Sequence, residues 1–305
     1  MFSRTLLPRG LLAGFACLAL AVLALALCGS GEAEERTLFE KTSLYSRILV
    51  TENDQGLRIL RFEEGGARQS VVKLGDPDHI ELPYARVMPV GLALVAKPQR
   101  VLIVGLGGGT IPGFLHAHFP QMRIDVVDID ADVVEVAKTY FGFREDPTMR
   151  AYVEDGRRFI EKRRNLYDLI LLDAFSSDDI PYALTTREFL RSARDALTAQ
   201  GIVVGNVWGR SSNRLYDSMV RTYQDVFEQL YIVDVPGAGN KILIALPRRQ
   251  RVTRDALARR AGEISKRHRF RFDMGDLVEY GFQDAGEEAP RGRVLTDKDR
   301  TRNAG

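Results

Sequence analysis

Short apolar segments separated by turn residues occupy the region before residue 80 and predict a small antiparallel sheet. Apolar runs at 48–50, 57–62 and 70–74 are separated by the sequences NDQG and EEGG. Gly56 and the pair Gly65-Gly66 permit tight turns, because glycine has no Cβ that would clash there. We therefore expect a small β domain over residues 40–80.

The pattern changes near residue 100, where apolar runs begin to alternate with amphipathic stretches. Continuous runs of Val, Ile and Leu are typical of strands buried on both faces, and hence of a mostly parallel sheet covered by helices. We predict a doubly wound α/β domain over 81–250, with its ligand at the carboxyl ends of the strands. The expected strands are 101–105, 124–129, 151–153, 168–174, 202–208, 231–235 and 241–246, and the expected helices are 110–119, 131–141, 156–163, 185–198 and 212–228.

The region 251–305 is expected to contain a basic helix and a polar tail. Ten Lys or Arg residues and only two acidic residues occur between Arg248 and Arg271. Such a stretch can contact an anionic membrane surface or a nucleic acid. A solvated amphipathic helix is the simpler interpretation, and we favour it. The tail from Ala285 onward is polar and is expected to be loose.

Residues 1–33 predict a leader. Arg4 and Arg9 precede an apolar segment at 11–28, and a polar run with small residues follows. This order is typical of a secretory signal peptide. The apolar segment also approaches the length of a bilayer-spanning helix, so a membrane anchor is the alternative. Arginines before it predict a body on the exported, periplasmic side; without a functional leader the chain would be cytoplasmic.

Composition narrows the chemistry. Cys17 and Cys28 are the only cysteines and both lie in the leader, which excludes a disulfide framework, a Cys-ligated metal site and a cysteine nucleophile in the body. The four histidines do not form a zinc-protease pattern, so we expect no metal. The net charge of +2 gives no overall attraction to nucleic acid, and we expect no nucleic-acid partner.

A glycine-rich turn follows the first predicted strand of the α/β domain. Gly105, Gly107 and Gly109 alternate there. Glycines allow the backbone to turn tightly and approach a ligand, with the next helix N-terminus directed at it. A dehydrogenase fingerprint would need glycine at position 110, where Thr110 stands. A purely structural turn is the alternative.

Acidic residues follow the next two strands. Asp128 ends the second strand, where a carboxylate can accept hydrogen bonds from both ribose hydroxyls of a nucleoside. Asp130 is expected to cap the following helix instead. Asp155 and Gly156 follow the third strand, where a side chain would lie near an adenine edge; a plain helix cap is the alternative.

A fourth feature is the acidic, serine-rich segment DAFSSDDIP, which follows the fourth strand and begins at Asp173. Asp173 directly follows a buried strand, and burying its carboxylate there without a partner would cost free energy. Such a loop is suited to holding an amine, with Asp173, assisted by Asp178 or Asp179, as the carboxylates. The four features together predict an adenosine-containing ligand.

At these residues the chain resembles the spermidine synthase (polyamine aminopropyltransferase) family over roughly residues 43–247. The resemblance implies a Rossmann-like fold of the class I methyltransferase type with a small N-terminal β domain. It also implies that decarboxylated S-adenosylmethionine, or S-adenosylmethionine itself, is the co-substrate. The matching runs are VLIVGLGGGTIPGFL, VVDIDADVVEVAKTYF, VEDGRRFI and YDLILLDAFSSDDIP.

The resemblance also implies roles for individual residues. Asp173 would orient or deprotonate the attacking amine, and Gln69 and Tyr84 would lie near the substrate cleft. In the nucleoside half, the three glycines Gly105, Gly107 and Gly109 would cradle the methionine-like portion, Asp128 would bind the ribose, and Asp155 with Gly156 would bind the adenine.

Several residues depart from the family pattern. Gly108 stands where the family glycine motif has aspartate, and Ser46 stands where it has an N-terminal glutamine. Ala85 and Arg86 follow Tyr84 in place of a His-Glu pair, and an arginine there would repel a polyamine. Glu81 matches a family acid. The cofactor half therefore fits the family better than the amine half.

Three functions remain open at this point. The first is aminopropyl transfer from decarboxylated S-adenosylmethionine to a polyamine such as putrescine. The second is small-molecule methyl transfer on the same scaffold, which the departures favour. The third is non-catalytic binding of an adenosine ligand at a membrane, which the leader favours. We expect a small-molecule amine as partner, and the small β domain could serve a homodimer contact.

Overall fold

The structure, a computed structural model, describes residues 35–175, 180–286 and 291–302. The predicted small antiparallel sheet is present and has four strands in sequential order. Its first strand was not expected, because its sequence RTLFEKT has only two apolar residues, which are adjacent and show no alternation. The strands are β1 (Arg36–Thr42), β2 (Arg47–Glu52), β3 (Leu57–Arg61) and β4 (Arg68–Lys73).

The second sheet has eight strands in the order β12-β10-β11-β9-β8-β5-β6-β7. The pairings from β7 to β9 are parallel, and those that join β11, β10 and β12 are antiparallel. This arrangement confirms the doubly wound α/β fold class. The strands are β5 (Arg100–Val104), β6 (Arg123–Asp128), β7 (Met149–Val153), β8 (Tyr167–Leu172), β9 (Leu197–Trp208), β10 (Gln229–Asp234), β11 (Asn240–Leu246) and β12 (Phe282–Asp284).

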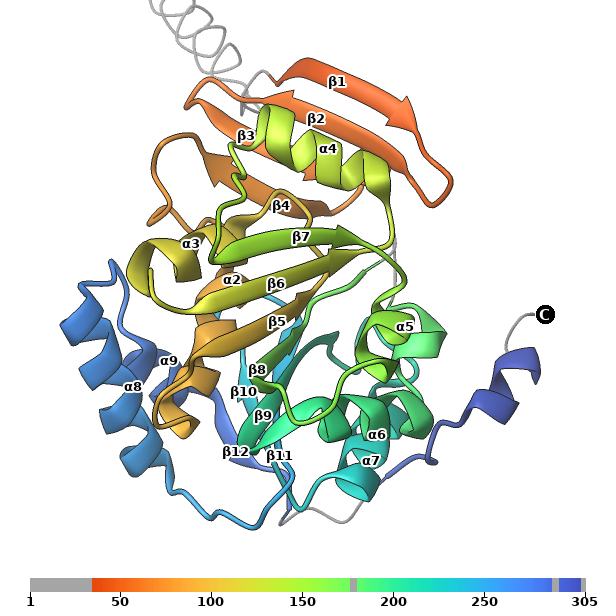
Figure 1. Cartoon of the computed structure of the whole chain (residues 1–305), viewed down its shortest axis with the longest axis vertical. Coiled ribbons are helices and arrows are strands. Elements are labelled where there is room, and N and C mark those ends of the chain that lie inside the picture. Colours follow the sequence, from red (N-terminus) through yellow and green to blue (C-terminus); the bar gives the residue numbers. More distant parts are fainter. Residues whose placement is uncertain (1–34, 176–179, 287–290, 303–305) are drawn as a thin grey trace, which may run out of the picture.

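Helices cover both faces of the large sheet (Figure 1). One apolar core lies between the sheet and α2 (Pro83–Val87), η1 (Met88–Leu94), α3 (Thr110–His118), α4 (Ala131–Tyr140), α8 (Arg254–His268) and α9 (Met274–Gly281). A second core lies between the other face and α5 (Gly156–Glu161), α6 (Arg187–Ala196) and α7 (Tyr216–Val226).

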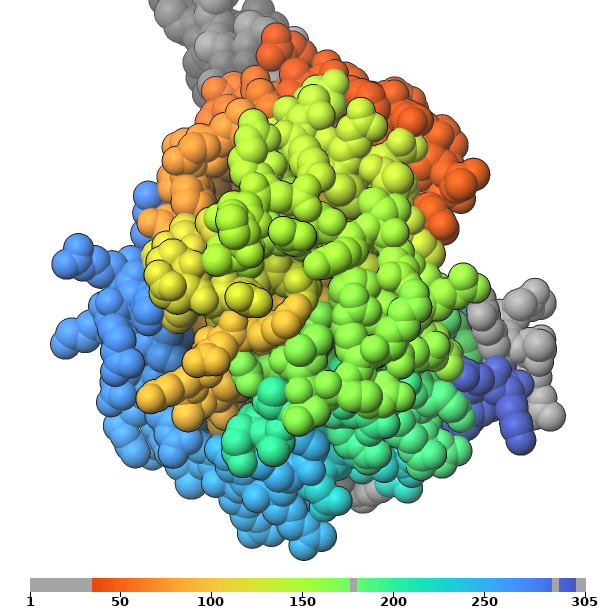
Figure 2. All heavy atoms as spheres, viewed as in Figure 1, coloured from red at the N-terminus to blue at the C-terminus, as the bar shows by residue number. Residues whose placement is uncertain are grey.

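The small sheet packs against α4, as Figures 1 and 2 show at one end of the molecule. Ile48, Val50 and Leu60 of the sheet form a buried cluster with Val133 and Val136 of α4. An ion pair of 2.7 Å between Lys41 and Asp132 joins the same two elements. The small sheet is therefore fixed next to the strand ends from which α4 begins.

The predicted helix at 185–198 ends two residues early, because β9 begins at Leu197 rather than at residue 202. The first residues of this long strand, such as Thr198 and Gln200, are not apolar. Leu197 pairs with Tyr167 of β8, which shows that the strand extends into this polar stretch.

The polar tail is not loose where the structure describes it, which corrects the sequence-based expectation. The Leu295 side chain is fully buried. The Asp297 carboxylate accepts two hydrogen bonds from the Arg157 guanidinium, at 2.7 and 2.6 Å. The tail is therefore held by the buried Leu295 side chain and by a bidentate ion pair to Arg157 of α5, features that polar composition alone does not reveal.

The basic stretch forms α8, which is amphipathic as expected. Leu257, Ala258 and Ala261 are buried against the domain, whereas Arg259 and Arg260 are exposed. Within the described residues, no helix combines the length and apolar character needed to cross a bilayer. The apolar leader segment at 11–28 lies outside the described residues, so its role stays a prediction.

Candidate functional site

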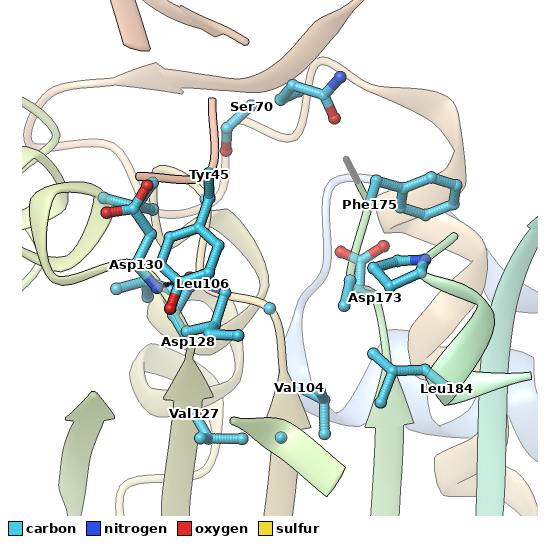
Figure 3. Close-up of a pocket in the computed structure, with 18 of the residues that line it drawn as sticks. Tyr45, Ser70, Val104, Leu106, Val127, Asp128, Asp130, Asp173, Phe175 and Leu184 are labelled. Atoms are coloured by element: carbon cyan, nitrogen blue, oxygen red, sulfur yellow. Dashed lines mark hydrogen bonds between the residues drawn. The ribbon is translucent and has the colours of Figure 1, made fainter. Parts of the chain in front are cut away.

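A cavity of about 290 Å³ lies at the carboxyl ends of β5, β6 and β8, beneath the β1–β2 turn and β4. Figure 3 places Asp128 and Asp130 at one end of this cavity and Asp173 with Phe175 at the other. The cavity brings together most residues that the sequence singled out: Gln69, Tyr84, Gly105, Gly107, Asp128, Asp155, Gly156 and Asp173. Asp178 lies outside the described residues.

The glycine turn is shaped by close backbone contacts. Gly105 has a φ of +101°, and a Cβ there would lie 2.3 Å from the Asp173 carbonyl oxygen. Only glycine satisfies both the left-handed backbone and this approach. Gly107, with a φ of +52°, also lines the cavity. The turn between β5 and α3 therefore lies directly against the segment that carries Asp173.

Gly109 does not line this cavity, unlike its two neighbours in the motif. It has a φ of +80° and is the N-cap residue of α3, with Phe143 packed against it. This backbone conformation, rather than contact with a ligand, explains why position 109 is a glycine. A Cβ on Gly108 would lie 2.8 Å from the Phe141 ring, so the family aspartate would require that ring to move.

Asp128 is bound to the glycine turn. Its Oδ2 accepts a hydrogen bond of 2.8 Å from the Leu106 amide, and its Oδ1 accepts one of 3.0 Å from the Asp130 amide. Burial raises the Asp128 pKa, and these backbone hydrogen bonds oppose that rise. Because a carboxylate has about four acceptor positions, Asp128 retains capacity for ribose hydroxyls at the cavity wall.

Asp130 caps α4, as expected, by accepting a hydrogen bond of 2.9 Å from the Asp132 amide. The Ser43 hydroxyl donates to its other oxygen, and Ser43 in turn accepts a hydrogen bond from the Tyr45 amide. This chain of contacts fastens the β1–β2 turn to the α/β domain. Tyr45, which the sequence analysis missed, lies beside Asp128 at the cavity mouth (Figure 3) and is 54% exposed.

Asp155 combines the two interpretations proposed from the sequence. Its Oδ1 caps α5 by accepting hydrogen bonds from the amides of Arg157 and Arg158, at 2.8 and 3.1 Å. Asp155 and Gly156 also line the cavity. A Cβ on Gly156 would lie 2.6 Å from Val104 Cγ1, so glycine allows α5 to approach β5 here.

Asp173 lies at the opposite end of the cavity, directly after β8. Asn206 donates a hydrogen bond of 2.9 Å to its Oδ1. The Tyr84 hydroxyl donates at 3.4 Å to the Gln69 carbonyl and lies close enough to Asp173 to influence its ionisation. Burial raises the Asp173 pKa to about 7, although Asn206 and Tyr84 lower it. Burial and the Asp173 charge raise the Tyr84 pKa, so this phenol stays protonated at neutral pH. The pair can hold an amine and accept its proton.

Among the residues that depart from the family pattern, Ser46 lines the cavity, whereas Ala85, Arg86 and Gly108 do not. Arg86 donates a hydrogen bond of 2.7 Å to the Ile80 carbonyl and does not line the cavity. The expected repulsion of a polyamine by Arg86 stays a prediction. Glu81 is also outside the cavity and lies 3.6 Å from Arg68 and 3.4 Å from His79.

The sequence analysis also missed Asn206, although the sequence contains a feature that points to it. Asn206 is an amide within the apolar run IVVGNVW, and a polar side chain in a buried strand needs a partner.

The described part of the chain contains no group of three or more His, Cys, Asp or Glu residues arranged to hold a metal ion.

Comparison with known proteins agrees with this architecture. The chain is 36% identical over 232 residues to the polyamine aminopropyltransferase of Vibrio vulnificus (strain CMCP6), covering 72% of this chain and 77% of that protein. The crystal structure of human methyltransferase-like protein 13 in complex with SAH superposes with a TM-score of 0.58 at 31% identity, covering 62% of this chain and 93% of that one.

A crystal structure of spermidine synthase in complex with the transition-state analogue AdoDATO superposes with a TM-score of 0.64 at 20% identity, covering 82% of this chain and 86% of that one. This likeness concerns the fold. The model of the spermine/spermidine synthase domain matches residues 84–247, the segment that contains Tyr84, the glycine turn and all three strand-end aspartates of the cavity. The chain is a member of the spermine/spermidine synthase family, a family of transferases.

Proposed function

We propose that this protein transfers an aminopropyl group from decarboxylated S-adenosylmethionine to a polyamine such as putrescine. The observation that carries this proposal is the buried Asp173 carboxyl at the end of the cavity opposite Asp128, in a cavity that Tyr84 also lines. A nucleoside held at Asp128 would direct its sulfonium side toward Asp173. Family membership makes this end of the cavity the expected place for an amine.

The reaction forms a C–N bond and breaks a C–S bond. A neutral amine nitrogen attacks the aminopropyl carbon next to the sulfonium, and the electron pair of the broken C–S bond stays with sulfur in methylthioadenosine. The attacking nitrogen then releases a proton. Asp173 is suited to accept it, because a group with a pKa of about 7 is ionised in part at neutral pH and becomes neutral on protonation.

The rest of the cavity would orient the nucleoside. Asp128 is available for the ribose and Asp155 for the adenine amino group, and Gly105 and Gly107 let the backbone lie close to the sulfonium side chain. Holding both reactants in line is itself a large part of the catalysis of such a transfer. These assignments agree with the roles that the family resemblance implies.

Methyl transfer from S-adenosylmethionine is the second candidate. It is favoured by the 31% identity to human methyltransferase-like protein 13 and by Gly108, where the family aspartate would require the Phe141 ring to move. Both reactions use the same nucleoside end of the cavity. They differ in the group that leaves sulfur, and therefore in the nucleoside product.

One experiment separates the candidates. Leader-free protein is incubated with putrescine and either decarboxylated or ordinary S-adenosylmethionine, and the nucleosides are identified by mass. Putrescine-dependent methylthioadenosine is the expected product. S-adenosylhomocysteine formed with an added acceptor would instead establish methyl transfer. Saturable nucleoside binding without turnover would overturn both and leave a binding protein.

A further inference from the structure

Two buried asparagines continue inward from Asp173 in a line of hydrogen bonds. The Asn206 Nδ2 donates to Asp173 Oδ1 at 2.9 Å, and the Asn240 Nδ2 donates to Asn206 Oδ1 at 2.9 Å. Asn206 is 3% exposed and Asn240 is 5% exposed. Asp173 directly follows β8, Asn206 lies in β9 and Asn240 begins β11, and these strands are consecutive in the sheet.

The register of β9 and β11 places both asparagines on the same face. Asn206 pairs with Ile242, and Asn240 pairs with Trp208, so the two amides are diagonal neighbours across the antiparallel pair. On that face, Ile242, which pairs with Asn206, and Val204, two positions before Asn206, are fully buried. Burying an amide in such a strand is costly unless it is hydrogen-bonded, and apolar side chains would form the sheet without that cost.

The contact from Asn240 decides the orientation of the Asn206 amide. An amide has one donor end and one acceptor end. Because Asn240 donates to the Asn206 oxygen, the Asn206 NH₂ group is directed at Asp173. The reverse orientation would place the Asn206 oxygen against the Asp173 carboxylate and would leave the Asn240 donor facing another NH₂ group.

We propose that Asn206 and Asn240 are positioning residues, which hold Asp173 Oδ1 and thereby present Oδ2 to the attacking amine. The role assigned to the amine rests on the proposed function. Asn240 does not line the cavity and acts through Asn206. The hydrogen bond from Asn206 also favours the ionised form of Asp173, because it lowers a pKa that burial raises.

The test follows the protonation of Asp173 directly, without turnover. The protonated carboxyl has an infrared C=O band, which is titrated in the full chain with the Asp173→Asn protein subtracted. For Asn206→Leu we expect the midpoint to rise by about 0.5–1 pH unit, because one hydrogen bond to the ionised form is lost. For Asn240→Leu we expect a smaller rise in the same direction, since Asn206 is then free to turn.

Steady-state kinetics provide the second readout. The acid limb of the kcat/KM profile is expected to move with the infrared midpoint, while the affinity for methylthioadenosine stays within about twofold. Thr222→Val is the control: Thr222 is fully buried, accepts a hydrogen bond from the Leu295 amide and lies on α7. This variant should lose stability without moving the midpoint. Asn240→Ser, which removes the reach to Asn206, replaces Asn240→Leu if that variant does not fold.

An unchanged infrared midpoint in folded Asn206→Leu protein overturns the positioning role. If the infrared midpoint of Asn240→Leu, or of Asn240→Ser, equals that of the wild type, Asn240 has no positioning role and the role belongs to Asn206 alone. The proposed function fails separately, if the wild type makes no putrescine-dependent methylthioadenosine. In that case the infrared titration still tests whether Asn206 and Asn240 act on Asp173.

Discussion

The Cβ position of Gly105 lies 2.3 Å from the carbonyl oxygen of Asp173, so the glycine turn and the loop that follows β8 are in direct backbone contact. The amide of Asp173 also donates a hydrogen bond of 2.8 Å to the Val104 carbonyl. The two halves of the proposed site, one for the nucleoside and one for the amine, are therefore set at a fixed separation by main-chain atoms. A side chain at position 105 would disturb both.

Gly105→Ala should accordingly lower both stability and turnover. The variant needs a strained φ of +101° and must displace backbone atoms, which costs about 2–4 kcal/mol in free energy of unfolding. Urea denaturation measures this loss. The control is Gly113→Ala in α3, where nothing lies within 4 Å of the added Cβ and the free energy of unfolding should rise by about 0.5–1 kcal/mol. Equal stability of the two variants would contradict the contact.

Asp173→Asn should retain nucleoside affinity and lose turnover by at least ~100-fold, because the amide cannot accept the proton of the amine. Calorimetric titration with methylthioadenosine and product analysis by mass measure the two effects. Unchanged turnover would remove Asp173 from the mechanism. The Asn206 donor would face an acceptor in one amide orientation, so the fold should be preserved.

Turnover should depend on pH through Asp173. Its pKa is raised to about 7, and only the ionised form accepts a proton, so kcat/KM should rise with pH through 7.

The effect of Asp173 on the stability of the fold has the opposite dependence on pH. The folded protein retains this proton between the ordinary aspartate pKa of 3.8 and 7 and the unfolded chain does not, so the contribution of Asp173 to stability falls as pH rises through that window.

Asp173→Asn should therefore be more stable than the wild type above pH 7, and the difference should shrink as the pH falls toward 4. Thermal denaturation at several pH values measures this convergence. A difference in stability that is the same at all pH values would show that the folded-state pKa of Asp173 is not raised.

Tyr45→Ala should weaken nucleoside binding by about 10-fold, because an exposed ring at the cavity mouth would be partly buried by the ligand. Tyr45→Phe should bind almost as well as the wild type. Leu44→Ala provides a matched control, since Leu44 is 95% exposed and does not line the cavity. Titration with methylthioadenosine measures all three, and equal losses for Tyr45→Ala and Leu44→Ala would argue against a ring over the ligand.

The strands that enclose the site were predictable because they are continuous apolar runs. The turn glycines and the strand-end aspartates were predictable for a related reason: parallel strands bring their carboxyl ends to one edge, so spacing along the chain becomes proximity in space. The cavity accordingly contains Gly105, Asp128, Asp155 and Asp173 together.

Other features depend on contacts between distant segments, and local pattern does not encode them. The helix η1 is apolar and buried throughout, so it shows no amphipathic period. Gly109 has the same spacing as Gly107 yet caps α3 behind the cavity. The contact of Asn206 with Asp173 spans 33 positions and arises only when β8 and β9 pair.

The packing of the small sheet on α4 also determines when the N-terminal region can acquire its structure. During synthesis β1 to β4 leave the ribosome well before α4, since Lys41 and its partner Asp132 are 91 positions apart. The buried cluster of Ile48, Val50 and Leu60 includes Val133, Val136 and Phe141, so it is complete only after α4 has emerged. This face of the first strands to be translated is thus covered only by a later helix, and the cavity that they roof also needs Asp173, which follows later still.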